Sequence, residues 1–330
     1  MSGLALQRFG MGTAAIGNLY AAVTDEVADA AVAAALRSGV RYFDTAPYYG
    51  FGLAERRLGA ALEAHGGEAI ISTKVGRLLE PVDNPEHERH GFVGGDPFRP
   101  VFDYSYDAVL RSHEESLKRL RRQRVEILLA HDLGKVTHGV EADRQMRDFL
   151  HGGYRAMAEL KASGAIDAIG VGVNETAVIE DLLGRVDLDV VLIAGRYTLL
   201  DQQAADRLFP ICQTKGVKVI VGGPYNSGIL ARPNISRTEA RYDYQAAPAE
   251  VVARTEAIER VCERFGVPLP AAALQFPSRH PAVGWVVAGC SSEREVKEAV
   301  GRLATPITEE LWQALEEQGL VSPEVEAIRE

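Results

Sequence analysis

The chain has few cysteines, no long hydrophobic run and no excess of positive charge. Its three cysteines, Cys212, Cys262 and Cys290, cannot all pair and lack the spacing of a metal site. They suit a reducing compartment such as the cytoplasm. No apolar stretch approaches the roughly 20 residues that a membrane helix needs, and the first residues lack the pattern of a secretory signal. We therefore expect a cytoplasmic protein that does not enter a membrane.

Negative charge predominates. Lys and Arg number 36 against 46 Asp and Glu, which gives a formal net charge of −10. This balance argues against nucleic acid or an anionic membrane surface as a partner. The hydrophobic share of 46% and the charged share of 25% are those of an ordinary globular protein. The sequence does not indicate an oligomeric state.

Short β-rich runs alternate with helical patterns along the whole chain. The runs predict strands near residues 9–13, 40–44, 69–74, 125–130, 166–173, 189–194, 217–221 and 284–288. Helical patterns lie near residues 24–37, 53–64, 106–120, 143–162, 176–183, 201–215, 250–280 and 293–300. Several strands are continuous apolar runs, as expected for parallel strands buried on both faces. Eight such units predict an α/β fold, a single-domain (β/α)8 TIM barrel over residues 1–330.

A doubly wound open sheet is the alternative architecture. It usually carries a glycine-rich nucleotide fingerprint after its first strand. Here Gly10, Gly12 and Gly17 come closest, and the third glycine falls two residues too late. Two irregular stretches, residues 76–104 and 222–248, each follow a strand, so we expect them to form active-site or cofactor lids at the C-terminal face of the barrel.

Polar residues stand at the ends of three consecutive predicted strands. Asp44 ends the second strand, Lys74 the third and His131 the fourth, and Tyr49 lies five residues after Asp44. Each of them alone is most simply a structural residue. Together they favour catalysis, because the C-terminal ends of barrel strands are where catalytic groups gather. Asp44 and Lys74 are also natural partners, since a buried charge needs one of opposite sign.

Three segments carry a resemblance to a known family. Residues 43–50 (FDTAPYYG), 72–76 (STKVG) and 128–132 (LLAHD) resemble motifs of the aldo-keto reductase superfamily, and the resemblance extends over nearly the whole chain. It implies a (β/α)8 barrel that binds a nicotinamide nucleotide without a Rossmann domain. That would explain the missing fingerprint.

The resemblance also implies catalytic roles. Tyr49 would be the general acid/base at the reacting oxygen. A tyrosine of ordinary pKa, near ~10, is a poor base at neutral pH and needs a cation to stabilise its phenolate. Lys74 would provide that charge, Asp44 would hold Lys74, and His131 would hydrogen-bond the substrate oxygen. A metal site at His131 and Asp132 is a weaker alternative. Arg77, just beyond Lys74, is interpreted as a solvated loop residue, with contact to the substrate as the alternative.

The cofactor positions implied by the resemblance lie after the later strands: Asn174, Gly222, Pro224, Ser227, Gly289, Cys290, Ser291 and Glu295. Asn174 matches the residue that binds the nicotinamide carboxamide. Two positions depart from the family, because Ala194 stands where many members have Gln and Gly222 where a Tyr usually stacks on the nicotinamide. Tyr225 is the alternative stacking residue.

The cofactor is expected to be NAD, with NADP as the alternative. NADP-preferring members usually carry Lys or Arg in the segment that begins at Gly289, whereas this chain has Ser291 and Glu295 there. A carboxylate would repel a 2′-phosphate and accept a hydrogen bond from a ribose 2′-hydroxyl. Arg294, next to Glu295, would reverse this preference if the alignment shifted by one residue.

Residues 194–202 and 222–230 resemble those of bacterial aldose 1-dehydrogenases in this family. The implied reaction is oxidation of the anomeric hydroxyl of an uncharged small-molecule aldose, such as L-fucose, D-arabinose or L-galactose, to a lactone. Oxidation of pyridoxal is an alternative with the same chemistry. The resemblance is also compatible with an NADPH-dependent aldehyde reductase and with a non-catalytic, cofactor-sensing binding subunit.

Overall fold

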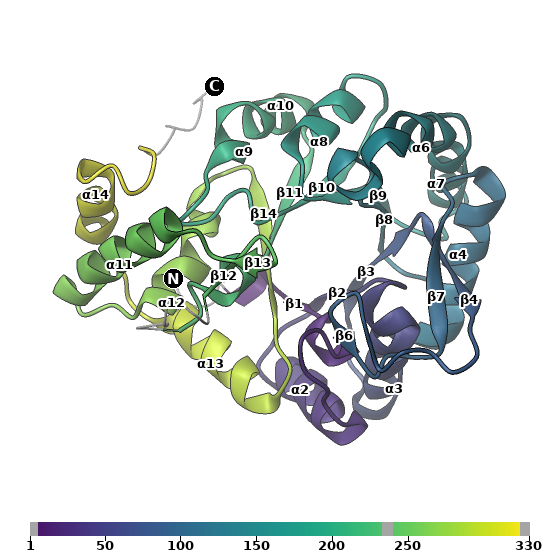
Figure 1. Cartoon of the computed structure of the whole chain (residues 1–330), viewed down its shortest axis with the longest axis horizontal. Helices are drawn as coiled ribbons and strands as arrows, with labels where there is room; N and C mark the ends of the chain where they lie inside the picture. The colour runs from purple at the N-terminus through teal and green to yellow at the C-terminus, as the bar shows by residue number, and fades with distance from the viewer. Residues whose placement is uncertain (1–5, 233–239, 324–330) are drawn as a thin grey trace. The chain divides into compact units, whose positions relative to one another are not determined.

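Eight parallel strands form a closed barrel, and helices separate them along the chain (Figure 1). The computed structural model describes residues 6–232 and 240–323. Around the barrel the neighbouring strands are β1 (Phe9–Gly12), β14 (Val283–Gly289), β11 (Lys218–Gly222), β10 (Val190–Ala194), β9 (Ala168–Val173), β8 (Ile127–His131), β3 (Ile70–Val75) and β2 (Tyr42–Asp44). All eight lie where the sequence predicts them, so the predicted (β/α)8 barrel is confirmed.

The helices also follow the predicted order. The α-helices of the first half are α2 (Asp25–Arg37), α3 (Leu53–His65), α4 (Tyr106–Leu120), α5 (Lys135–His138), α6 (Ala142–Asp148) and α7 (Tyr154–Ala162). Those of the second half are α8 (Thr176–Leu183), α9 (Gln203–Asp206), α10 (Leu208–Lys215), α11 (Ala249–Arg264), α12 (Leu269–Gln275), α13 (Glu293–Ala304) and α14 (Glu309–Glu317). The short 3-10 turns are η1 (Ala15–Gly17), η2 (Tyr49–Gly52), η3 (Gly139–Glu141), η5 (Asn226–Gly228) and η6 (Phe276–Arg279).

Contacts within the chain group it into two compact units. The N-terminal unit comprises Gly10–Leu192 and Gly289–Lys297, and the C-terminal unit comprises Met1–Phe9, Ile193–Ala288 and Glu298–Glu330.

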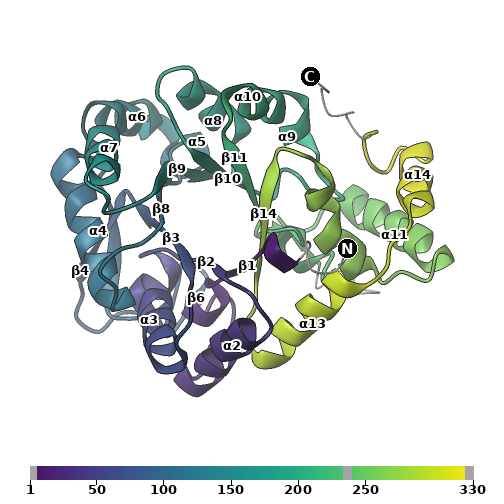
Figure 2. The same cartoon turned by 180° about the vertical axis from the view of Figure 1, so that it is seen from behind.

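In the N-terminal unit the strands pair in parallel, β1 with β2, β2 with β3, β3 with β8 and β8 with β9. Every residue of β8 is buried, as expected for a strand covered on both faces. Helices α2, α3, α4 and α7 follow one another along the outside of these strands (Figures 1 and 2). Thr24, the predicted N-cap, accepts a hydrogen bond from the Val27 amide and so begins α2.

The stretch of residues 76–104, predicted to be irregular, contains two small antiparallel ladders. Strand β4 (Arg77–Pro81) pairs with β7 (Phe98–Phe102), and β5 (Glu88–Arg89) pairs with β6 (Phe92–Val93). The prolines that suggested a loop are compatible with these strands, because both strands of a two-stranded ladder are edges and an edge tolerates proline. The expectation of irregular structure is therefore wrong here.

The predicted helix at residues 143–162 is interrupted. A π-helical turn, η4 (Phe149–Gly153), separates α6 from α7, and the apolar periodicity of the sequence does not show this insertion. None of the helices in the described ranges is both long and apolar enough to span a membrane.

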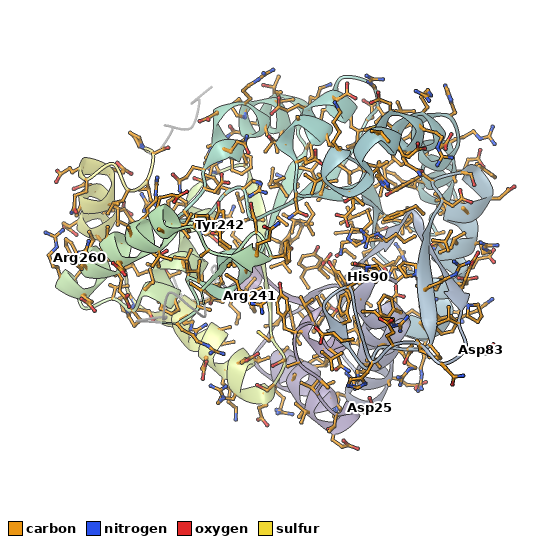
Figure 3. The ribbon with its side chains drawn as sticks, in the orientation of Figure 1. Asp25, Asp83, His90, Arg241, Tyr242 and Arg260 are labelled. Carbon is orange, nitrogen blue, oxygen red and sulfur yellow. The ribbon has the colours of Figure 1, made fainter. Side chains whose placement is uncertain are left out.

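In the C-terminal unit β11 pairs in parallel with β14. Part of the second predicted lid, residues 222–248, forms η5 and the short hairpin of β12 (Arg241–Tyr242) and β13 (Gln245–Ala246). Figure 3 labels Arg241 and Tyr242 on this hairpin. The rest of that lid, residues 233–239, lies outside the described residues.

Candidate active site

A buried ion pair joins the ends of β2 and β3. The Lys74 Nζ lies 2.7 and 2.9 Å from the two carboxylate oxygens of Asp44 and also donates to the Thr45 carbonyl at 2.8 Å. Both side chains are buried, with 1% and 4% of their surfaces exposed. The Ser72 hydroxyl donates to the same carboxylate at 2.7 Å. A buried pair persists only when its remaining hydrogen-bonding groups are satisfied in this way.

Tyr49 completes the predicted contact with this pair. It begins η2, and its hydroxyl lies 3.1 Å from the Lys74 Nζ, which donates to it. The following residue, Gly50, has a φ of +65°, and a Cβ on it would lie 2.4 Å from the Gly17 carbonyl oxygen. Only glycine fits this turn. The turn brings the half-buried Tyr49 ring over Lys74, where the ammonium group stabilises negative charge on the phenol oxygen.

His131 ends β8 beside Tyr49. The two rings are 5.9 Å apart and nearly perpendicular, and the Tyr104 hydroxyl donates to the His131 carbonyl at 2.5 Å. Burial, together with the positive charges of Arg77 and Lys74, holds the pKa of His131 well below its usual range. His131 is therefore uncharged at neutral pH, and its one N–H can donate to an oxygen.

Arg77 is not the solvated residue that the sequence suggested. Only 5% of its surface is exposed. Its guanidinium carbon lies 3.7 Å from the centre of the Tyr48 ring and 4.9 Å from that of Phe102, and its Nη2 donates to Asp132. The prediction failed because this partner lies 55 residues away in sequence. Their opposite charges could have suggested this pair, because Arg77 lies just after β3 and Asp132 just after the adjacent strand β8.

Gly76 lies between β3 and β4, at a position where only glycine fits. Its φ is +100°, and a Cβ on it would lie 2.1 Å from a carbon of the Tyr104 ring. Any side chain would thus combine a strained backbone with a direct overlap. The close packing of Tyr104 on Gly76 sets the path by which the chain leaves β3 for β4.

A cluster of aromatic rings lies next to Tyr49, and no pattern in the sequence indicates it. The buried Phe92 ring is 6.5 Å from the Tyr49 ring and 5.5 Å from the Tyr48 ring. His90, which Figure 3 labels inward of Asp83, lies 6.0 Å from the Tyr48 ring and 6.0 Å from the Phe51 ring. Phe92 and His90 come from the first lid, so this lid contributes directly to the surroundings of the candidate active site.

The predicted cofactor residues of the N-terminal unit fall into two groups. Asn174 is half-buried just after β9. Gly289 ends β14, Cys290 is buried, and Ser291 donates from its amide and its hydroxyl to Glu295 at 2.7 and 2.8 Å. The Glu295 amide donates to Ser292 at 3.3 Å. These reciprocal bonds cap α13, so the carboxylate of Glu295 is fixed at the start of this helix.

In the C-terminal unit the predicted residues lie on the loop that follows β11. Gly222 ends the strand, Pro224 follows it, and the Ser227 hydroxyl accepts a hydrogen bond from the Tyr244 amide at 2.9 Å. Tyr225, the alternative stacking residue, accepts a hydrogen bond from Arg302 at 3.1 Å, and the guanidinium of Arg302 lies over its ring. The side chain of Tyr225 is thus engaged by α13.

Comparisons with known proteins show the family and the fold to which this chain is similar. The model of the aldo/keto reductase family matches residues 8–319. A pyridoxal 4-dehydrogenase from Microbacterium luteolum is 42% identical, covering 97% of this chain and 96% of the relative. A D-threo-aldose 1-dehydrogenase from a Pseudomonas species is 36% identical, with the same two coverages. The structure of an aldo-keto reductase, AKR11C1 from Bacillus halodurans, superposes with a TM-score of 0.72 at 27% identity and covers 98% of this chain and 95% of its own.

Proposed function

Because this chain belongs to the aldo/keto reductase family, and is therefore an NAD(P)-dependent oxidoreductase, we propose that it oxidises a cyclic hemiacetal to a lactone with NAD, and that its substrate is pyridoxal. The observation that carries this choice is the cluster of aromatic rings beside Tyr49 and His131. The proposal reverses the order of the two substrates expected from sequence alone, in which an aldose came first.

The side chains present can perform the proton transfer of such a reaction. Tyr49 as a phenolate takes the proton of the hemiacetal hydroxyl as that carbon loses its hydride, and the C–O bond becomes the carbonyl of the lactone. Lys74 holds the negative charge on Tyr49 before the transfer, and Asp44 fixes Lys74 in place. His131 donates its N–H to the same substrate oxygen and orients it.

The nicotinamide nucleotide supplies the hydride acceptor. Asn174 would hold its carboxamide, and residues 289–292 with the start of α13 would hold the adenosine end of the nucleotide. The loop with Gly222, Pro224 and Ser227 would lie along the nucleotide. Glu295 supports NAD over NADP, since its carboxylate is fixed at the helix start, where a 2′-phosphate would be repelled.

Pyridoxal fits the aromatic cluster for a physical reason. In its hemiacetal form it has a planar pyridine ring, which stacks favourably against aromatic side chains. A pyranose instead presents hydroxyl groups, each of which needs a hydrogen-bond partner when it leaves water. The partly exposed rings of Tyr48 and Tyr49 offer surface of the first kind, and the buried rings of Phe92 and Phe51 pack against them.

An aldose remains the second candidate. The relative that is 36% identical over nearly its whole length is named for an aldose, and the proton transfer described above is the same for the anomeric hydroxyl of a sugar.

A panel assay with NAD tests the proposal. Reduction of the cofactor is followed by absorbance with pyridoxal, L-fucose, D-arabinose and L-galactose, and we expect kcat/KM for pyridoxal to be at least about 100-fold higher, equivalent to roughly 3 kcal/mol. Phe92→Ala should lower the pyridoxal value about tenfold and change the sugar values less. Phe98→Ala, a phenylalanine of the same lid outside the cluster, serves as the control. Turnover of a sugar but not of pyridoxal would favour the second candidate, and no turnover of either would refute both.

A further inference from the structure

Arg77 is a buried cation with incomplete hydrogen bonding. Its Nη2 is bound to Asp132, whereas its Nε and Nη1 are buried and have no hydrogen-bond partner among residues 6–232 and 240–323. The rings of Tyr48 and Phe102 lie over the guanidinium and compensate in part, because aromatic faces attract cations. Such an arrangement is costly to maintain, so it calls for a reason beyond the stability of the lid.

The reason lies in the carboxylate that Arg77 binds. The oxygen of Asp132 that accepts from Arg77 is the same one that lies 3.5 Å from the Nε2 of His131. Asp132 has a φ of +52°, a left-handed conformation that turns the chain directly after the strand end. Arg77 and His131 thus compete for one oxygen atom.

We propose that Arg77 is a positioning residue: by binding Asp132, it prevents this carboxylate from capturing His131 and leaves the N–H of His131 free for the substrate oxygen. The inference rests on the proposed function only for the identity of that oxygen. The competition among Arg77, Asp132 and His131 concerns the protein alone.

The surroundings of His131 support this competition. The charged and titratable groups that face it are Lys74 from β3, Arg77 from β4, Tyr49 from η2, Tyr48 just before η2, and Asp132 directly after β8. Tyr104 donates to its carbonyl and also contacts His138, and Glu175 acts on Asp132. Asp44 is already neutralised by Lys74. Asp132 is therefore the one carboxylate among these groups close enough to His131 to form an ion pair with it.

Removing the cation changes the balance in a defined direction. Burial raises the pKa of Asp132, and Arg77 is the largest influence opposing that rise. Without Arg77, the imidazole of His131 is the neighbouring group that can balance the negative charge of Asp132, by taking up a proton from solvent. An Asp132–His131 ion pair would form, and the Nε2–H of His131 would point at Asp132 instead of the substrate.

Histidine NMR titration of the protein without ligands tests the proposal independently of any activity. His131 is identified as the resonance missing from the His131→Gln spectrum. In the unaltered protein it should stay neutral while the exposed histidines titrate, in line with its depressed pKa. In Arg77→Met it should titrate at least about one pH unit higher. The double variant Arg77→Met/Asp132→Asn should behave like the unaltered protein, because no carboxylate is left to stabilise the imidazolium.

Two outcomes would overturn the proposal: an unchanged His131 titration in Arg77→Met, or a double variant that titrates like Arg77→Met. The control is Arg89→Met, which removes an arginine stacked on Phe51 in the same lid but bound only to backbone carbonyls, and His131 should not respond to it. If Arg77→Met does not fold, Arg77→Gln replaces it. This side chain lacks the charge that pairs with Asp132, so the titration of His131 should shift in the same direction by a smaller amount, and no shift would overturn the proposal.

Activity provides a second, separable readout. With whichever substrate the panel identifies, Arg77→Met should lower kcat more than tenfold with a smaller change in KM, and Asp132→Asn in the same chain should restore most of the loss. If no substrate is turned over, the proposed function fails while the titration still decides the role of Arg77.

Discussion

The two units differ in the side chains that stand at the C-terminal ends of their strands. In the N-terminal unit β2, β3 and β8 end at or near Asp44, Lys74 and His131, which hydrogen bonds and ring contacts connect to Tyr49. In the C-terminal unit β10 and β11 end at Ala194 and Gly222, which carry no polar side chain. The groups for proton transfer are therefore assembled within one unit, whereas the other offers mainly backbone at its strand ends. The N-terminal unit also contains Asn174 and Glu295, which are proposed to hold the nucleotide, so proton transfer and nucleotide binding call for separate substitutions.

The sharpest way to test this contrast is to remove the Tyr49 hydroxyl. Tyr49→Phe should lower kcat by about 10³-fold, within the range typical of a lost general acid/base, and leave the dissociation constant of NAD nearly unchanged. Steady-state kinetics and fluorescence titration with NAD measure the two effects. Tyr48→Phe, at the neighbouring position, should change kcat by less than about fivefold. A Tyr49→Phe enzyme within tenfold of the unaltered one would show that Tyr49 is not the proton acceptor.

An intermediate effect is expected at the start of α13. Glu295→Gln keeps an acceptor for Ser291 and removes the negative charge, so the KM for NADP should fall about tenfold, equivalent to about 1.4 kcal/mol, while that for NAD changes little. Glu293→Gln is the matched control, because Glu293 lies in the same helical turn but pairs with Arg37 and Lys297. Comparing KM for both nucleotides decides the matter. A lower KM for NADP than for NAD in the unaltered enzyme would contradict the assignment of NAD.

The smallest effect concerns the buried histidine of the C-terminal unit. Burial lowers the pKa of His280 to about 4, and no cation contributes to this shift, in contrast to His131. Because an unfolded histidine titrates near ~6.5, acid favours the unfolded chain as the pH falls from about 6.5 to about 4. The free energy of unfolding should fall by roughly 1–3 kcal/mol over this window through His280 alone.

Urea unfolding at pH 7 and pH 5 measures the loss. His280→Gln keeps an acceptor for the Ala282 amide and should reduce the difference in unfolding free energy between the two pH values. His65→Gln, at an exposed histidine paired with Asp29, is the control and should not reduce it. An equal loss of stability in His280→Gln and the unaltered protein would exclude His280 as a source of the acid sensitivity.

The barrel and the positions of Asp44, Lys74 and His131 at its strand ends were predictable for the same reason, whereas Tyr49 was identified from the family resemblance. Buried parallel strands appear in the sequence as local apolar runs, and Asp44, Lys74 and His131 stand where those runs end. Local patterns therefore predicted both the strands and these three residues. The ladders of residues 76–104 were not predictable in this way, because β4 pairs with a strand some 20 residues away and proline obscures the alternation. Arg77 was misinterpreted because its burial depends on Tyr48, Phe102 and Asp132, which only the folded chain brings to it.

Gly76 has an evolutionary consequence. Tyr104 occupies the space that any side chain at position 76 would need, so we expect single substitutions of Gly76 to be rejected. Tyr104 is itself held by its hydrogen bond to the His131 carbonyl. A lineage that changed its substrate could vary the tip of the hairpin β4–β7 freely. It would inherit the junction between Lys74 and Arg77 as a fixed unit. New specificity in this branch of the family would therefore arise from residues beyond Arg77, with the junction passed on unaltered.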